Sequence, residues 1–188
     1  MPAEGMNKVE LNTYQNPEFD RGASKLRELL WMFCSALFFQ HSLAGLNSFK
    51  AFLLRRFGAT IGKGVLIKPN VRIKFPWKLA IGDHVWIGEQ VWIDNLSSVS
   101  IADNVCLSQG AMLLCGNHNY KLASFDLMVA PIHLEEGVWI GTKAVVCPGV
   151  RCKSHAVLSV ASVATADLEA YTIYQGNPAQ AIKTRVIH

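Results

Sequence analysis

The chain has 188 residues, of which 51% are hydrophobic, and a formal net charge of +4 at pH 7. This length suits one domain with a continuous hydrophobic core and a small appendage. The positive charge is mild and spread along the sequence, whereas a nucleic-acid groove needs clustered Lys and Arg, so no nucleic-acid partner is expected.

The chain begins with a polar stretch that carries neither a repeat nor a helical pattern. We expect residues 1–21 to form a polar N-terminal segment. This stretch lacks the apolar core of a cleavable signal peptide, so none is predicted.

Residues 22–57 carry leucines and phenylalanines at helical spacing, with breaks at Gly45 and Gly58. We expect two helices here that cap one end of the domain. The stretch Leu29–Phe39 is strongly apolar, but its eleven residues fall short of the roughly 20 that span a bilayer. Two interpretations stay open for residues 26–39: capping or subunit packing, and weak contact with a membrane surface.

From residue 58 to residue 170 an apolar side chain recurs every six positions. A helical period of 3.6 or a strand period of 2 cannot produce this spacing. Six-residue repeats are typical of a parallel β-helix, in which each hexad forms a short strand and a corner, and three hexads close one coil. The sequence therefore predicts an all-β column of about five coils, and the first positions of its hexads are Ile61, Ile67, Ile73, Ile81, Ile87, Ile93, Ile101, Leu107, Leu113, Leu134, Ile140, Val146, Cys152, Leu158 and Ala164.

The first three coils begin at Ile61, Ile81 and Ile101, which are twenty residues apart. Each eighteen-residue coil is thus followed by two extra residues at one corner. The repeat then stops and resumes at Leu134, so residues 119–133 are predicted to leave the column as an excursion loop. Such a column exposes a sheet edge at each end and needs caps, and the two helices are expected to cover the first coil. Residues 171–188 are expected to form a short C-terminal tail.

His118 stands directly before the predicted excursion loop. An imidazole, with a reference pKa of about 6.5, suits removal of a proton from a hydroxyl at neutral pH. Cys115, three residues earlier, raises the alternative of a covalent Cys/His mechanism. His118 could also be a structural histidine that closes the third coil.

The five cysteines form no CxxC pair, and most of them occupy repeat positions as small hydrophobic residues: Cys34, Cys106, Cys115, Cys147 and Cys152. This usage predicts a protein of a reducing compartment, the cytoplasm. If residues 26–39 contact lipid, the protein would lie at the periphery of the inner membrane.

Several motifs resemble those of one family. From Phe57 to its end the chain resembles the left-handed β-helix (hexapeptide-repeat) acyltransferases, and it is similar to the exopolysaccharide acetyltransferases of the colanic-acid type. The segments that carry the resemblance are 57–62, 76–79, 115–120 (CGNHNY), 138–141 (VWIG), 148–150 (PGV) and 174–179 (YQGNPA). The left-handed winding is implied by this resemblance and not by the repeat, since ordinary crossovers are right-handed.

The resemblance implies an O-acetyltransferase that moves an acetyl group from acetyl-coenzyme A directly to a sugar hydroxyl in glycan biosynthesis. The acceptor would be a sugar or a lipid-linked oligosaccharide, no metal is expected, and the active sites would lie between the subunits of a homotrimer. His118 corresponds to the family's general base. The candidates for acceptor binding are Asn95, Asn117, Tyr120 and Asp126, and those for coenzyme binding are Trp139, Gly141, Thr142, Ala161, Asn177, Pro178, Lys183 and Arg185.

Two alternatives stay open. A γ-class carbonic-anhydrase-like enzyme would hold a metal with three histidines, although Ala123 stands where that family offers a second ligand. The column could also be an inactive scaffold.

Overall fold

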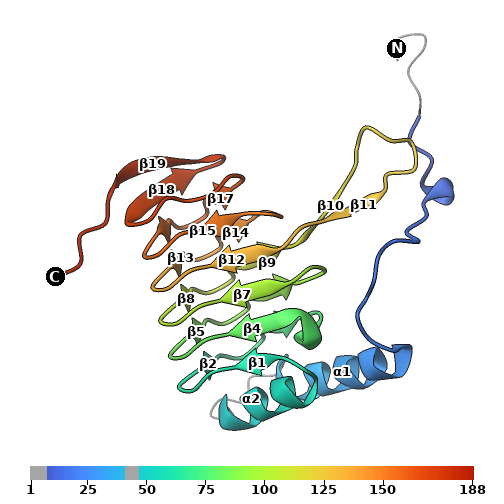
Figure 1. The fold of residues 1–188 in the computed structure, drawn as a ribbon, viewed down its shortest axis with the longest axis horizontal. Helices are drawn as coiled ribbons and strands as arrows, with labels where there is room; N and C mark the ends of the chain where they lie inside the picture. The colour runs from blue at the N-terminus through green and yellow to red at the C-terminus, as the bar shows by residue number, and fades with distance from the viewer. Residues whose placement is uncertain (1–7, 41–46) are drawn as a thin grey trace.

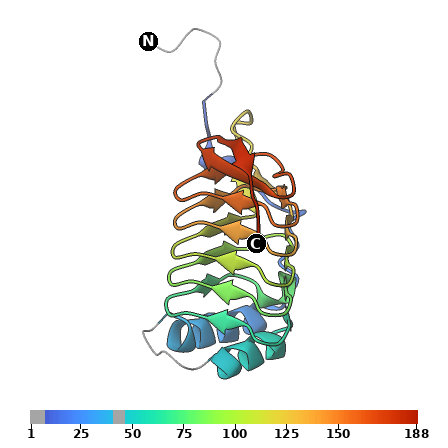
Figure 2. The same ribbon diagram turned by 90° about the vertical axis from the view of Figure 1, so that its left-hand side faces the viewer.

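The computed structural model describes residues 8–40 and 47–188. The chain forms a parallel β-helix, a column of three-sided coils with two helices at one end and a β-hairpin at the other (Figures 1 and 2). Residues 1–7 and 41–46, which include the predicted helix break at Gly45, lie outside the described residues.

Three sheets form the sides of the column. The first sheet contains β1 (Thr60–Ile61), β4 (Leu79–Ile81), β7 (Val99–Ile101), β12 (Ile132–Leu134) and β15 (Arg151–Cys152). The second sheet contains β2 (Leu66–Ile67), β5 (Trp86–Ile87), β8 (Cys106–Leu107), β13 (Trp139–Ile140), β16 (Val157–Leu158), β18 (Thr172–Gly176) and β19 (Ala179–Thr184). The third sheet contains β3 (Arg72–Ile73), β6 (Trp92–Asp94), β9 (Met112–Leu114), β14 (Val145–Val146) and β17 (Val163–Ala164).

The core is the stack of hexad first positions. Ile61, Ile81 and Ile101 are register partners on successive strands of the first sheet, and all three are buried. The residue before each of them points outward, because side chains alternate across a strand. The six-residue period thus produces one continuous apolar column inside the three sheets.

The column has about six turns, against the five that the hexads predicted. Five coils place a strand in each sheet, and β18 with a bridge between Cys152 and Leu168 adds part of another turn. The strand β19 then folds back antiparallel on β18. Residues 171–188 therefore contain a hairpin and are not a simple tail, a difference that arises because residues after Ala164 no longer follow the hexad.

Two helices close the first coil: α1 (Lys25–Phe38) and α2 (Asn47–Arg56). Their side chains bond the free strand edges on all three sides of that coil. On the first sheet Arg55 donates to Ile61 O at 2.8 Å, and on the third the indole of Trp31 donates to Ile73 O at 2.9 Å. On the second, Asn47 Oδ1 accepts from Ile67 N and Lys50 Nζ donates to Ile67 O. The cap therefore satisfies a sheet edge that would otherwise pair with other chains.

The excursion from the column is a β-hairpin and begins earlier than predicted. Strand β10 (Gly116–His118) pairs antiparallel with β11 (Leu127–Val129), and the chain rejoins the first sheet at Ile132. The predicted limits, 119–133, were wrong at both ends. The two extra residues at this corner extend the strands of the first sheet, so Ile132 and His133 belong to β12.

The N-terminal segment runs beside the column from the excursion hairpin down to α1 (Figure 1). It contains a 3-10 turn, η1 (Leu11–Thr13), and Glu10 N donates to Ala123 O of the hairpin at 2.8 Å. Near the other end the indole of Trp77, in the 3-10 turn η2 (Pro76–Lys78), donates to Arg21 O at 2.6 Å. No helix in the described ranges is long and apolar enough to cross a membrane.

Candidate active site

His118 is the last residue of β10, and its half-buried ring is fixed on the excursion hairpin. Its Nδ1 lies 2.8 Å from Phe125 O, and its ring stacks on the Phe125 ring with centroids 4.6 Å apart and planes within 7° of parallel. A carbonyl oxygen can only accept, so Nδ1 carries the hydrogen of this bond. In the neutral ring Nε2 then holds the lone pair, which is the form that a general base needs.

The hairpin turn holds Phe125 in position. Phe125 has a φ of 53°, an uncommon conformation for a bulky residue, and its N–H donates to Leu122 O. Asn119 N donates to Asp126 O at 2.8 Å, which closes the hairpin next to His118. The carbonyl and the ring of Phe125 therefore both contact the imidazole.

Asn117 precedes His118 and is exposed. Its Oδ1 accepts from His118 N at 2.8 Å. Tyr120, at the hairpin tip, is 75% exposed and lines neither of the two cavities described below. Of the acceptor candidates on the hairpin, Asp126 alone lines a cavity.

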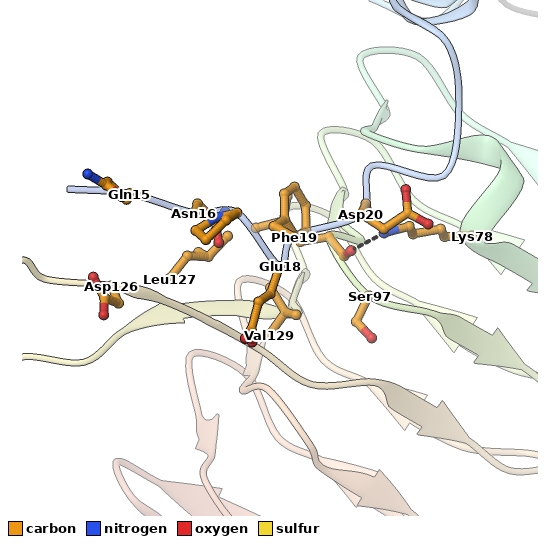
Figure 3. Close-up of a pocket in the computed structure, with 12 residues that line it drawn as sticks. Gln15, Asn16, Glu18, Phe19, Asp20, Lys78, Ser97, Asp126, Leu127 and Val129 are labelled. Carbon is orange, nitrogen blue, oxygen red and sulfur yellow. Dashed lines mark hydrogen bonds between the residues drawn. The ribbon is translucent and has the colours of Figure 1, made fainter.

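That cavity, of about 540 Å³, lies between the N-terminal segment, the column and the hairpin (Figure 3). Asn16, Glu18 and Asp20 contribute from the N-terminal segment, and Asp126 and Leu127 from the hairpin. His118 itself does not line this cavity, but Leu127 is its register partner on the neighbouring strand of the hairpin. We call this space the polar cavity, and its carboxylates and amide are groups that hydrogen-bond hydroxyls.

Lys78 crosses one wall of the polar cavity. Its Nζ donates to Leu96 O at 2.8 Å and to Asp20 O, and it lies 5.0 Å from the centre of the Phe19 ring (Figure 3). Burial lowers the pKa of Lys78 from its ordinary value. The lysine thereby joins the N-terminal segment to two corners of the column.

The sequence did not single out Asn16, Glu18, Asp20 or Lys78 as site residues. Residues 14–20 follow no repeat, so nothing local in the sequence indicates which wall of the column they cover. The signal that the sequence did offer was the absence of any repeat in these residues, in a chain that is otherwise regular.

The prediction that Asn95 contacts the acceptor was wrong. Asn95 is completely buried, and its Oδ1 accepts from Lys74 N and Phe75 N while its Nδ2 donates to Phe75 O. The amide closes the corner after β3, where the chain would otherwise leave backbone groups unpaired. Because the side chain is completely buried in this corner, a ligand cannot reach its amide.

Cys115 is also fully buried, and burial raises the pKa of its thiol to about 11. The thiolate is the nucleophilic form of cysteine, so this thiol is un-ionised near neutral pH. The geometry therefore gives no support to a covalent mechanism through Cys115.

A second cavity, of about 550 Å³, lies along the second sheet and contains most of the predicted coenzyme residues. Its lining includes Trp139, Gly141 and Thr142, from β13 and the corner after it, and Lys183 and Arg185, from β19 and the residues after it. The space between them is mainly apolar, with Val157, Val160, Ile173 and Ile182. We call this space the apolar groove.

The groove residues differ in which of their hydrogen-bonding groups are already paired within the chain. The indole of Trp139 is half exposed and donates to Ser108 Oγ at 2.9 Å. Gly141 N donates to Leu158 O at 2.7 Å, so it is not free to stabilise an oxyanion. The N–H of Thr142, by contrast, has no acceptor among the described residues, and Thr142 O accepts from Ala161 N.

The C-terminal coenzyme candidates differ in their exposure and in whether they line the groove. Lys183 is exposed, whereas one guanidinium nitrogen of Arg185 donates to Gly137 O and His155 O. Asn177 and Pro178 form the exposed turn between β18 and β19 and do not line the groove. The structure thus brings together five of the eight coenzyme candidates and leaves Ala161 beside them.

Within one chain the polar cavity and the apolar groove share no residue. The hairpin with His118 leaves the corner between the third and first sheets, whereas the groove lies on the second sheet. No group of three His, Cys, Asp or Glu that could hold a metal ion occurs in the described ranges 8–40 and 47–188.

Comparison with known proteins identifies the family. The chain is 36% identical over 177 residues to an Escherichia coli protein named colanic acid biosynthesis acetyltransferase WcaF, covering 94% of this chain and 97% of that one. The chain belongs to the hexapeptide-repeat acetyltransferases. The galactoside O-acetyltransferase of Escherichia coli is a more distant relative, 26% identical over 148 residues that cover 77% of this chain and 73% of the relative.

Solved acetyltransferases share the fold. A hexapeptide-repeat acetyltransferase of Vibrio cholerae in complex with acetyl-coenzyme A superposes with a TM-score of 0.78 at 20% identity, covering 94% of this chain and 97% of that one. A galactoside acetyltransferase in complex with coenzyme A gives a TM-score of 0.76 at 23% identity, with 85% and 80% covered. No model of a protein family matches the sequence.

Proposed function

We propose that this hexapeptide-repeat acetyltransferase moves an acetyl group from acetyl-coenzyme A to a sugar hydroxyl in exopolysaccharide or related glycan biosynthesis. The observation that carries the proposal is the fixed imidazole of His118, whose Nδ1 is bonded to Phe125 O and whose Nε2 is left as the basic nitrogen. The relatives named for colanic acid and galactoside acetylation support a sugar acceptor.

In the proposed reaction His118 Nε2 takes the proton of the acceptor hydroxyl as the oxygen attacks the thioester carbonyl carbon. A tetrahedral oxyanion forms, to which the Thr142 N–H is the proposed donor, since it has no acceptor in the described part of the chain. The carbon–sulfur bond then breaks, and the proton passes from Nε2 to the departing sulfur. No acyl-enzyme forms, which agrees with the buried, un-ionised thiol of Cys115.

The apolar groove is the proposed site of the coenzyme. Trp139 and Lys183 are in register three strands apart in the second sheet, about 14 Å at roughly 4.8 Å per strand, which suits a thin pantetheine arm. The exposed ammonium of Lys183 suits a phosphate. Asn177 and Pro178 would meet the coenzyme only beyond the groove. Solved relatives carry acetyl-coenzyme A or coenzyme A, which supports this donor.

The polar cavity is the proposed site of the acceptor, with Asp126 and Glu18 as hydroxyl ligands. Asn117 and Tyr120, beside His118 and exposed, are proposed to contact the acceptor from the hairpin. Because His118 and the apolar groove lie on different edges of one chain, we propose a homotrimer in which a neighbouring subunit supplies the groove. Left-handed winding and a cytoplasmic location belong to the same proposal.

The test is a thiol-release assay with acetyl-coenzyme A across a panel of sugars, nucleotide sugars and lipid-linked oligosaccharides. The His118→Gln variant should lose a factor of about 10²–10⁴ in kcat, the usual contribution of a general base. His133→Gln is the matched control, because that ring belongs to β12 and is bonded to Ser100 Oγ within the first sheet. A His118→Gln variant with the wild-type rate would refute the mechanism.

A further inference from the structure

The outer side of α1 is apolar and uncovered. The stripe of the helix that contains Trp31, Ser35 and the following Phe39 is buried against the column. On the opposite side six large apolar residues are 41% to 67% exposed: Leu26, Leu29, Leu30, Met32, Phe33 and Leu37. A helix that is apolar all round normally has both sides covered.

The apolar surface continues onto α2. Phe38 of α1 contacts Phe49 of α2 edge to face with ring centroids 5.0 Å apart, and Phe49 stacks on Phe52 at 6.4 Å. Phe52 is 53% exposed. The two helices lie side by side across the end of the column, so this surface, which we call the cap face, forms one end of the molecule (Figures 1 and 2).

Positive charge is concentrated at the same end, and the expectation of an evenly spread charge was wrong for this part of the chain. Between Glu28 and Asp83 the chain has no Asp or Glu, and the eight cations in this stretch are Lys50, Arg55, Arg56, Lys63, Lys68, Arg72, Lys74 and Lys78. These residues belong to α2 and to the first coil with its corner. Lys50 is buried, Lys78 is partly buried, and the other six are exposed. Two of these six form ion pairs with the next coil, Lys63 with Asp83 and Lys74 with Asp94, which leaves Arg55, Arg56, Lys68 and Arg72 without a carboxylate partner in the described part of the chain.

Cations also border the apolar residues. Residues four apart share a face of a helix, so Lys25 lies at the N-terminal end of the same face of α1 as Leu29, Phe33 and Leu37. Arg56 stands four residues after Phe52 on α2. An apolar helix face bordered by Lys and Arg is the pattern of a helix that lies in the plane of an anionic membrane surface.

We propose that the cap face docks on an anionic lipid surface, with the α1 side chains in the headgroup boundary and the cations of α2 and the first coil at the lipid phosphates. The 14 residues of α1 are too few to span a bilayer, so the helix lies along it. The positive stretch favours lipid over a second copy of this chain, because two identical cationic ends repel each other.

Docking would place the polar cavity near the lipid. The cavity is lined by Lys78, from the corner of the first coil, and by Leu96 and Ser97, from the corner of the second. Successive strands rise about 4.8 Å, so this wall begins roughly 5–10 Å above the cap. If the proposed function holds, an acceptor held on a membrane lipid could reach this cavity without leaving the surface.

The test is flotation of the full chain with vesicles of phosphatidylcholine, with and without phosphatidylglycerol. Wild-type protein should float with the anionic vesicles and much less with neutral ones. The double variant M32Q/F33Q should bind at least about tenfold more weakly, since two buried apolar side chains are lost. The variant R56Q/K68Q should lose several-fold in binding to anionic vesicles only, as should wild type at high salt.

V186Q/I187Q is the matched control, because it changes two exposed apolar residues at the other end of the chain and should float like wild type. Wild-type protein that ignores anionic vesicles, or M32Q/F33Q that binds them normally, would overturn the proposal. So would a lower oligomeric state of M32Q/F33Q in sedimentation, which would make the cap face a contact between copies. Thiol release with a soluble sugar should be unchanged in M32Q/F33Q, so failure of docking and failure of the proposed function are separate results.

Discussion

Single polar residues at the corners of the column have opposite environments, and Asn95 and His118 illustrate the difference. The side chain of Asn95 points inward, and its amide is hydrogen-bonded to the backbone of Lys74 and Phe75. His118 lies on the hairpin and bonds Phe125 O through Nδ1, so its Nε2 takes no part in that bond. Both residues look equally suited to a sugar in the sequence. Only the direction of the side chain separates a structural amide from a candidate base.

Replacing Asn95 with Ala should destabilise the fold without weakening acceptor binding. The change leaves Lys74 N, Phe75 N and Phe75 O unpaired in the interior, at a cost of about 2–4 kcal/mol in the free energy of unfolding. Denaturant unfolding measures this loss, and Gln180→Ala, at an exposed position of β19, is the control. A stable Asn95→Ala variant with a raised KM for the acceptor would contradict this prediction and would show that Asn95 contributes to acceptor binding.

Because the thiol of Cys115 is buried, we expect the free energy of unfolding to fall at alkaline pH. Burial raises the pKa of the folded thiol from 9.0 to about 11, so the unfolded state loses this proton at lower pH. The stabilising contribution is complete below about pH 9 and falls by about 2–3 kcal/mol as the pH rises to about 11. Unfolding measured across this range should depend less on pH in Cys115→Ala than in wild type. Equal slopes in the two proteins would contradict the prediction, and Cys34→Ala, on the cap helix, is the control.

At the scale of elements, the excursion hairpin is the part that converts a structural column into a candidate enzyme. Its strands β10 and β11 pair with each other and with no sheet of the column. It therefore orients His118 through its own turn, in which Phe125 supplies both a carbonyl and a stacked ring.

Removing the ring of Phe125 should lower kcat while leaving the column intact. Phe125→Ala keeps the carbonyl but loses the stacking, which is worth about 0.5–1.5 kcal/mol, so kcat should fall up to about tenfold. Steady-state kinetics measures the effect, and thermal unfolding should be nearly unchanged. Leu122→Ala, at an exposed position of the same hairpin, should keep the wild-type kcat. A wild-type kcat in Phe125→Ala would show that the stacking does not orient the base.

At the scale of the whole molecule, the two halves of the proposed site occupy different edges of the column. The polar cavity and the apolar groove share no residue within a chain. If a neighbouring subunit completes the site, damage to the two halves in separate chains can be repaired by mixing those chains.

Co-expression of two inactive variants tests this arrangement. His118→Gln removes the base, and Val160→Trp fills the groove at a position that is 63% exposed and tolerant of a larger side chain. Random assembly of the two should restore about a quarter of the wild-type activity, because about one subunit pair in four combines an intact base with an intact groove. Either variant expressed alone is the control. A mixture as inactive as its components would place the whole site within one chain.

The sequence predicted the repeating part of the molecule well and the irregular parts less well. The buried stack of Ile61, Ile81 and Ile101 lies as the hexads require. The predicted limits of the excursion were wrong, because β10 pairs with β11. The five predicted coils are followed by part of another turn, because β18 joins the column without continuing the hexad. Pairing between strands of irregular spacing leaves no periodic signal.

By itself the sequence determined the column. With a six-residue period and three hexads in each coil, the first positions of equivalent hexads stack on top of one another in successive coils, independently of the irregular segments. It also marked His118, through a motif that interrupts the repeat. The tertiary structure alone decided that Asn95 is buried, that residues 15–20 form a wall of the polar cavity, and that the groove lies away from the base. These outcomes depend on contacts between segments far apart in the chain, and side-chain direction and long-range contact are not encoded in any local pattern.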